Sequence, residues 1–258
     1  MKSYRPWLLA TLISANISAA PSDETHYFTV LHTNDSHGHF WQNERGEYGF
    51  PAQKTVIDSI RQEVESQGNA LILLHAGDYN TGVPESDLLN AIPDIEGLNA
   101  MGYEAVALGN HEFDFPLNQL LEQQKQAKFA LVSANVLSKE TEKPLVNPYI
   151  VLQKGALKVA VMGLTTEDTA KLSNPEVTAE VVFKPAIKTA QETLKIINEH
   201  DKPDIRIALT HMAITTTHSM DKMPLVMSAL LARSKKGIWI LLLVGIRITL
   251  FALMKMAL

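Results

Sequence analysis

The chain has 258 residues, enough for one large domain or two small ones. Its formal net charge of −5, with 20% charged and 46% hydrophobic residues, is ordinary for a soluble protein and argues against a surface that binds nucleic acid polymers. Because the chain contains no cysteine, disulfides and thiolate metal sites are excluded, and any metal ion must be bound by imidazole and oxygen ligands.

Residues 1–20 have the pattern of a secretory signal peptide. Lys2 and Arg5 form a positive start, residues 7–17 an apolar middle, and residues 18–20 a small-residue end. The apolar run is short for a membrane-spanning helix, which favours cleavage over an uncleaved anchor. We therefore expect an exported protein, which in a bacterium would be periplasmic.

Helical and strand patterns alternate along the rest of the chain, which predicts an α/β fold. The segment from Asn80 to Glu85 is polar and contains Gly82 and Pro84, so we expect a loop there that frames a cleft. The predicted helices are 49–67, 87–101 with an interruption at Pro93, 117–128 and 185–200, and two of the predicted strands are 129–133 and 158–163.

Four further predicted strands end in polar side chains that commonly bind metals or act in catalysis. In an open α/β sheet the carboxyl ends of the strands converge on one crevice, so these side chains are expected to meet. The strands and the polar residues after them are 28–32 with Asp35 and His37, 70–74 with Asp78, 106–108 with Asn110, His111 and Asp114, and 205–210 with His211.

These four blocks, in this order, resemble the calcineurin-like metallophosphoesterases. The segments Leu31–Asp35, Asn80–Asp87 and Gly163–Thr166 are similar to the bacterial 5′-nucleotidase/UDP-sugar hydrolase family in particular. The resemblance covers residues 27–212 and implies a metallophosphoesterase domain over residues 25–212. The implied fold is a sandwich of two mixed sheets flanked by helices.

The resemblance also implies two divalent metal ions and a role for each polar residue. Asp78 would bridge the ions, Asp35 and His37 would hold one, and Asn110 and His211 the other. Mixed nitrogen and oxygen ligands suit Zn²⁺, Mn²⁺ or Co²⁺ better than Mg²⁺ alone. By resemblance His111 is not a ligand; it would contact the phosphoryl group or protonate the leaving group, with Asp114 orienting its ring.

Other polar residues lie beside these motifs. For His32, His39 and His75 we expect packing or supporting roles, because a histidine that flanks a motif is more often structural than a ligand. Asn34 and Glu112 are candidates for hydrogen bonds to the ligand residues.

The tail departs from the family after Met212. The family has a later Gly-Gly-His-x-His/Gln block that supplies two more metal ligands, and this block is missing here. Residues 238–253 are instead nearly all apolar. A membrane span is one interpretation, although Arg247 near the middle of the run would cost about 2.5–3.5 kcal/mol on insertion scales.

A frameshift is the interpretation we favour for the tail. Codons can be chosen from Met212 onward so that the frame beginning at each third base resembles the family's own continuation, including Gly-Gly-His-Ser-His. A match of this length in one constant frame is hard to obtain by chance. We therefore interpret residues 213–258 as an aberrant apolar tail that follows a single-base deletion, and expect a fold that is incomplete at its C-terminus.

The function that the resemblance implies is hydrolysis of extracellular nucleotides or UDP-sugars by two-metal hydroxide attack, with His111 and Asp114 assisting the leaving group. The alternative is a catalytically inactive truncated remnant or a non-enzymatic protein tethered to a membrane by its tail. The sequence leaves open the native metal, the preferred nucleotide and the oligomeric state.

Overall fold

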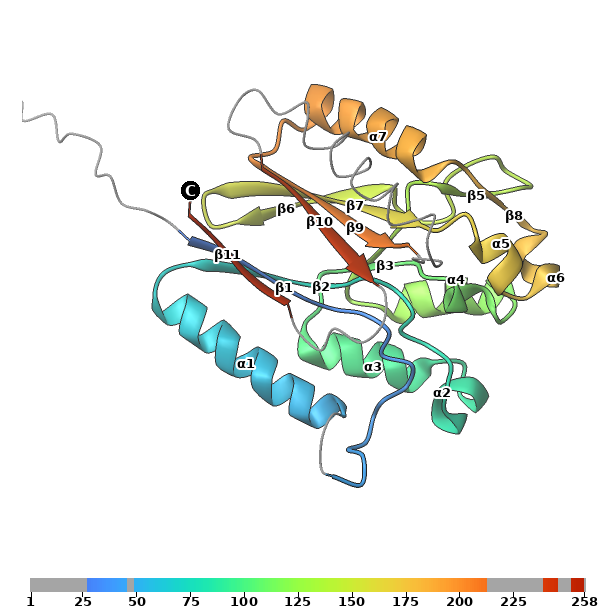
Figure 1. Cartoon of the computed structure of the whole chain (residues 1–258), viewed down its shortest axis with the longest axis horizontal. Helices are drawn as coiled ribbons and strands as arrows, with labels where there is room; N and C mark the ends of the chain where they lie inside the picture. Colours follow the sequence, from blue (N-terminus) through green and yellow to red (C-terminus); the bar gives the residue numbers. More distant parts are fainter. Residues whose placement is uncertain (1–26, 46–48, 213–238, 246–251, 258) are drawn as a thin grey trace, which may run out of the picture.

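The structure is a computed structural model that describes residues 27–45, 49–212, 239–245 and 252–257 (Figure 1). The helices are α1 (Phe50–Ser66), α2 (Pro84–Leu88), α3 (Ile92–Met101), α4 (Leu117–Gln126), α5 (Thr169–Leu172), α6 (Pro175–Thr178) and α7 (Ala186–His200), with the short 3-10 helix η1 (His111–Phe113). The strands are β1 (Tyr27–Thr33), β2 (Ala70–His75), β3 (Ala105–Ala107), β4 (Ala130–Val132), β5 (Val136–Ser138), β6 (Tyr149–Lys154), β7 (Leu157–Thr165), β8 (Val181–Phe183), β9 (Ile205–His211), β10 (Trp239–Gly245) and β11 (Ala252–Ala257).

Two mixed sheets form the centre of the protein. The first has the strand order β11-β1-β2-β3-β4, in which only β11 is antiparallel to its neighbour. The second has the order β10-β9-β7-β6, in which β6 is antiparallel to β7. Strands β5 and β8 form a separate antiparallel pair. The predicted sandwich of two mixed sheets is therefore confirmed.

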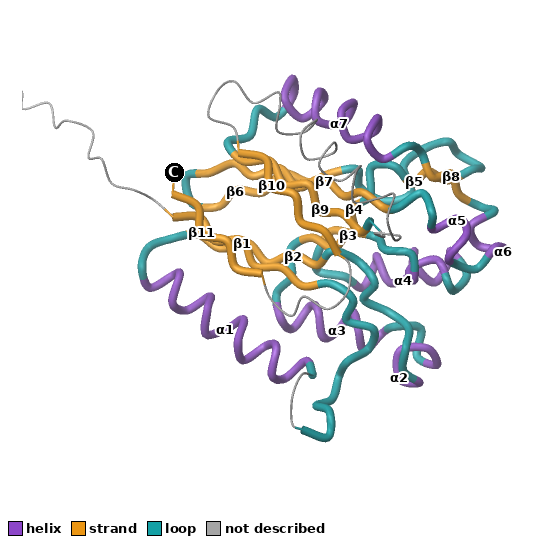
Figure 2. Tube along the Cα trace, viewed as in Figure 1, coloured by secondary structure: helices purple, strands orange, loops and turns teal. Residues whose placement is uncertain are grey.

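The layers follow from the alternation of side chains along each strand. In β1, Val30 joins the apolar core between the two sheets, while its neighbour Leu31 joins the core beneath α1, α3 and α4. A third cluster, which includes Ala160 and Ile197, lies between the second sheet and α7. Figure 2 shows the resulting order of helices, sheet, sheet and helix.

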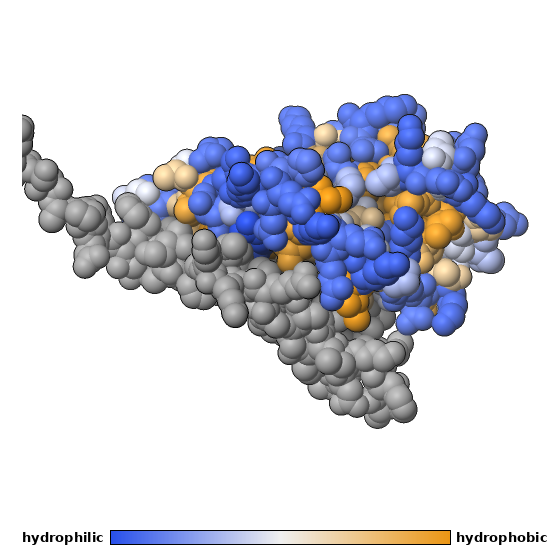
Figure 3. All heavy atoms as spheres, turned by 90° about the horizontal axis from the view of Figure 1, so that it is seen from above, coloured by the Kyte–Doolittle hydropathy of each residue, from blue (hydrophilic) through white to orange (hydrophobic). Residues whose placement is uncertain are grey.

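The helices bury one face each, as amphipathic patterning predicts. In α1, Ile57 and Val64 are buried while Val56 is 42% exposed. In α7, Ile197 is buried while Ile187 and Ile196 are partly exposed. Seen from above in Figure 3, hydrophilic residues predominate on the described surface, with hydrophobic residues in smaller patches between them.

The region of residues 80–101 differs from the expectation. The predicted loop Asn80–Glu85 runs into α2, which begins at Pro84, and the predicted interrupted helix is two helices. The chain turns at Asn90 and Ala91, which have φ values of 56° and 57°. Pro93 then lies in the first turn of α3, where its missing N–H breaks no helical hydrogen bond.

The tail supplies one edge strand to each of the two sheets. From the sequence we had expected the fold to lack its last strands. β10 pairs with β9 and β11 pairs with β1. The physical reason is that an edge strand carries unpaired N–H and C=O groups, which any extended apolar segment can pair with. The predicted signal peptide (1–20) and residues 213–238 of the tail lie outside the described residues. Within the described ranges, no helix has the length and apolar character that a membrane span requires.

Asp94 is a buried carboxyl group in α3 with no exposed surface. Burial raises the pKa of Asp94 to about 7, an effect that contacts with Ser86 and the Gly38 backbone only partly offset. Because the folded state holds this proton above the pH at which the unfolded chain releases it, the contribution of Asp94 to stability falls as the pH rises from about 4 to 7.

We therefore expect the substitution Asp94→Asn to flatten the dependence of stability on pH. Between pH 5 and pH 8 the wild-type chain should lose on the order of 2 kcal/mol more unfolding free energy than the variant. Urea unfolding at the two pH values measures this difference, with Glu199→Gln on the exposed side of α7 as the control. An equal loss in wild type and Asp94→Asn would contradict the expectation.

Candidate metal centre

The polar residues at the ends of β1, β2 and β9 come together, as the convergence of parallel strands predicts. Ligand atoms of Asp35, Asp78 and His211 all lie within 4.8 Å of one another. Ligand atoms of His37, Asp78 and His111 form a second group, and they also lie within 4.8 Å of one another. Asp78 belongs to both groups, so its carboxylate lies between two sets of potential ligands.

Asp78 is buried, with 3% of its surface exposed. Its Oδ2 lies 3.1 Å from His211 Nε2, and its Oδ1 accepts a hydrogen bond from the His111 backbone N–H at 3.0 Å. Burial acts to raise the pKa of Asp78, but the hydrogen bond and charge of His211, together with the contacts to His111, outweigh it and lower the pKa. Burial likewise acts to lower the pKa of His211, but Asp78 raises it to about 9.

Two of the histidines are oriented by backbone carbonyls. His211 Nδ1 lies 2.8 Å from the carbonyl oxygen of Ala76, and His37 Nδ1 lies 3.2 Å from that of Asn80. A carbonyl only accepts, so each Nδ1 carries the proton and donates it. In both rings Nε2 then faces the carboxylates; for His37 it lies 3.9 Å from Asp35 Oδ1 and from Asp78 Oδ2.

The backbone at the centre is unusual. Asp35, His37 and Asp78 have φ values of 51°, 45° and 55°, in the left-handed region that side chains with a Cβ rarely adopt. Each such residue costs about 1–3 kcal/mol and persists only where its surroundings hold it. Gly109 is needed here, because a Cβ at this position would collide with the Asp78 carboxylate.

His111 and Asp114 form the predicted pair. His111 Nδ1 donates to Asp114 Oδ2 at 2.5 Å, and this contact raises the pKa of His111 to about 9 against the effect of burial. The His111 ring meets that of His37 edge to face, with centroids 4.9 Å apart. Asn110, the remaining predicted ligand, lies half-buried in the same loop, and its backbone carbonyl oxygen accepts a hydrogen bond from Ser173 Oγ at 2.6 Å.

Glu112 and Asn34 contact the ligand residues directly. Glu112 accepts hydrogen bonds from the backbone N–H groups of Asp78, Tyr79 and Gly109, at 3.0, 3.0 and 2.5 Å. Burial, with the nearby charge of Asp78, raises the pKa of Glu112 to about 7. The Asn34 side-chain amide donates to Asp35 Oδ2. Glu112 therefore joins the loop after β2 to the loop after β3.

The histidines that flank the motifs differ in their surroundings. His39 Nδ1 donates to the carbonyl oxygen of Ser36 at 2.5 Å. His32 is buried, which lowers its pKa, and its Nδ1 has no partner. Burial, together with the charge of His211, lowers the pKa of His75 to about 3, so this ring is neutral at physiological pH.

Ser173 and Asn174 also support the site and were not anticipated from the sequence. Besides the bond from Ser173 to Asn110, Asn174 Nδ2 donates to the carbonyl oxygen of Asp114 at 3.3 Å. The two residues therefore brace the turn that carries His111. These contacts join segments about 60 residues apart, so no local pattern in the sequence indicates them.

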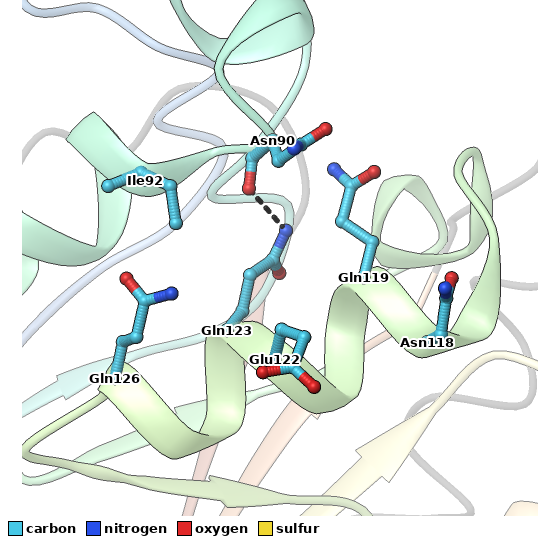
Figure 4. Close-up of a pocket in the computed structure, with 7 residues that line it drawn as sticks. All are labelled: Asn90, Ile92, Asn118, Gln119, Glu122, Gln123 and Gln126. Atoms are coloured by element: carbon cyan, nitrogen blue, oxygen red, sulfur yellow. Dashed lines mark hydrogen bonds between the residues drawn. The ribbon is translucent and has the colours of Figure 1, made fainter.

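A separate cavity of about 400 Å³ lies between the start of α3 and α4 (Figure 4). Carboxamide side chains predominate in its lining, which consists of Asn90, Ile92, Asn118, Gln119, Glu122, Gln123 and Gln126. Gln123 donates to the carbonyl oxygen of Asn90 at 3.0 Å and accepts from Tyr79 Oη at 2.7 Å. None of the lining residues belongs to the two groups of potential metal ligands.

Comparison with known proteins identifies relatives of this chain. The model of the calcineurin-like phosphoesterase family matches residues 28–241. Protein UshA of Escherichia coli is 52% identical over 202 residues, which are 78% of this chain and 37% of that protein. A 5′-nucleotidase of Vibrio cholerae is 48% identical over 204 residues, 79% of this chain and 37% of the relative.

Solved structures agree with the sequence relatives. The crystal structure of a 5′-nucleotidase precursor from Thermus thermophilus has a TM-score of 0.69 and 29% identity, and the match covers 85% of this chain and 41% of that one. The structure of an NAD nucleotidase from Haemophilus influenzae, at 24% identity and a TM-score of 0.68, has the same fold. The chain thus spans less than two fifths of the length of the curated relatives UshA and the Vibrio cholerae enzyme.

Proposed function

Because the chain belongs to the calcineurin-like phosphoesterase family, we propose that it carries the metal-binding part of an exported hydrolase that removes phosphate from nucleotides or UDP-sugars. The observation that carries the proposal is the meeting of Asp35, Asp78 and His211 with His37 and His111 at one edge of the sheets. The nucleotide substrate is supported by the names of the relatives, which include 5′-nucleotidases.

The donor set fits two divalent cations. The shared position of Asp78 suits a bridging carboxylate, and the carbonyl-held Nδ1 atoms of His37 and His211 leave Nε2 as the ligand atom of each ring. Asp35 and His37 would hold one ion, and Asn110 and His211 the other. Because all ligands are nitrogen or oxygen, Zn²⁺, Mn²⁺ and Co²⁺ are the suitable ions.

The remaining residues would act on the substrate. Two bound divalent cations would supply a nucleophile at neutral pH and charge stabilisation at phosphorus. His111, with Nδ1 held by Asp114, has Nε2 for the transfer of a proton to the leaving oxygen. Glu112 would hold the Asp78 backbone in place while the substrate binds.

The substitution Asp78→Asn tests the proposed centre. Since Asp78 would contact both ions, its loss should weaken Mn²⁺ binding by about tenfold or more, which isothermal titration calorimetry measures on the folded chain. Asp58→Asn, an exposed carboxylate on α1, is the control and should bind as the wild type does. Equal Mn²⁺ affinity in Asp78→Asn and wild type would refute the metal centre.

Export is the second part of the proposal and rests on the residue pattern of the first 20 positions. We expect chain recovered from the periplasm of an expressing bacterium to lack about 19 or 20 N-terminal residues, in line with typical signal lengths. Mass spectrometry of the recovered chain identifies its N-terminal residue. An intact Met1 in periplasmic material would contradict the expectation.

A further inference from the structure

We propose that the hydrogen bond between His75 and Ser36 is a positioning contact, which sets the spacing of the metal ligands by joining the loop after β1 to the loop after β2. The inference rests on the proposed function and adds two residues to its machinery. Ser36 lies between Asp35 and His37, and His75 lies three positions before Asp78. The pair therefore joins the segment that carries Asp35 and His37 to the segment that carries Asp78.

The geometry determines which atom donates. The Gly77 backbone N–H donates to His75 Nδ1 at 3.2 Å, so Nδ1 carries no proton. In the neutral ring the proton is then on Nε2, which donates to Ser36 Oγ at 2.5 Å. His75 therefore uses both nitrogens to connect the loops, one to each.

The contact is shielded from bulk water. His75 has no exposed surface and Ser36 has 6%. The imidazole packs against the rings of Tyr103 and Tyr79, with centroids 5.6 and 6.5 Å away. A buried N–H that loses its acceptor is costly. Removal of the Ser36 hydroxyl would therefore favour a shift of the two loops relative to each other.

The two loops need such a contact because both contain strained backbone. Asp35 and His37 flank Ser36 with left-handed φ values, and Asp78 has a third. The loops also share backbone hydrogen bonds, from Asp35 N to Gly77 O at 3.0 Å and from His37 N to Asp78 O at 3.4 Å. Without the side-chain contact, relaxation of either loop would change the separation of the carboxylates and weaken metal binding.

The matched variants Ser36→Thr and Ser36→Val test the proposal on the full chain. Threonine and valine have nearly the same shape, so the two variants differ mainly in the hydroxyl group. We expect Ser36→Val to bind Mn²⁺ about tenfold or more weakly than Ser36→Thr in calorimetry, as for other residues that support metal ligands. Since affinity is measured on folded protein, a purely structural role would change the unfolding temperature of the metal-free chain but not this ratio.

A second variant covers the case in which neither substitution at Ser36 folds. In His75→Asn, the shorter side chain can place its amide oxygen near the Gly77 N–H but does not reach Ser36. This variant should therefore also weaken Mn²⁺ binding about tenfold. In the His75→Asn background, the additional variants Ser36→Thr and Ser36→Val should bind Mn²⁺ with equal affinity.

The outcomes separate this inference from the proposed centre. Equal Mn²⁺ affinity of the Thr and Val variants, or wild-type affinity in His75→Asn, would overturn the positioning role even where Asp78→Asn loses binding. Wild-type affinity in Asp78→Asn would instead overturn the metal centre, and this inference with it.

Discussion

Restoration of one base after the Met212 codon is expected to raise the rate of 5′-AMP hydrolysis by at least about a thousandfold over the chain as given. The resemblance implies two more metal ligands in the Gly-Gly-His-x-His/Gln block, one for each ion. If both are missing, the ions would bind more weakly and the reacting groups would be misplaced. A misplacement of about 1 Å can cost on the order of a hundredfold in rate. Weaker binding of the ions would account for the rest of the expected effect.

The pairing of β10 with β9 supports this expectation. The strands are parallel, and Gly245 lies level with His211 at the edge where the proposed ligands meet. With the codons that give the block, its first histidine would be encoded across the codons of Gly245 and Ile246. In the sequence it would therefore follow directly after the position level with His211. In the chain as given, β10 consists of apolar residues and glycine.

The measurement is phosphate release from 5′-AMP with added Mn²⁺ or Zn²⁺, for the chain as given and the restored chain at equal folded concentration. The restored chain with Asp78→Asn is the control, and it should be inactive if the metal centre carries the activity. Comparable rates for the given and restored chains would contradict both the frameshift interpretation and the assignment of the missing ligands.

The second large effect is expected for His111→Ala in the restored chain. Removal of a general acid typically lowers a rate by about 10²–10⁴-fold, and we expect a loss in kcat of this size. The metal content should stay unchanged, because the proposed ligands do not include His111. Metal analysis of the purified variant, together with kcat, separates the two roles. Loss of metal in His111→Ala would show that this residue is a ligand, which its place near His37 and Asp78 would then explain.

Asn110→Ala is the matched variant from the same loop. As a proposed ligand, Asn110 should affect both metal content and rate. Asp114→Asn should affect the rate alone, because Asp114 contacts His111 Nδ1 and would act through the orientation of that ring. A normal kcat in Asp114→Asn would contradict the orienting role.

The sequence by itself determined the class of fold and the convergence of the ligand residues. Apolar runs that end in Asp78 or His211 predict buried strands with polar ends, and parallel strands bring such ends to one edge. The helix predicted over residues 49–67 likewise agrees with α1 to within one residue at each end. These features depend on the period of the side chains along one element, which can be read without knowledge of the rest of the chain.

Only the tertiary structure decided how the loops that carry the ligands are held. The left-handed backbone of Asp35 and Asp78, the contact of His75 with Ser36 and the brace from Ser173 to Asn110 follow no period in the sequence. The apolar tail likewise has no preference of its own for one sheet edge until β9 and β1 offer unpaired backbone groups. Each of these contacts joins segments distant in the chain, so it exists only once packing of the two sheets has brought those segments together.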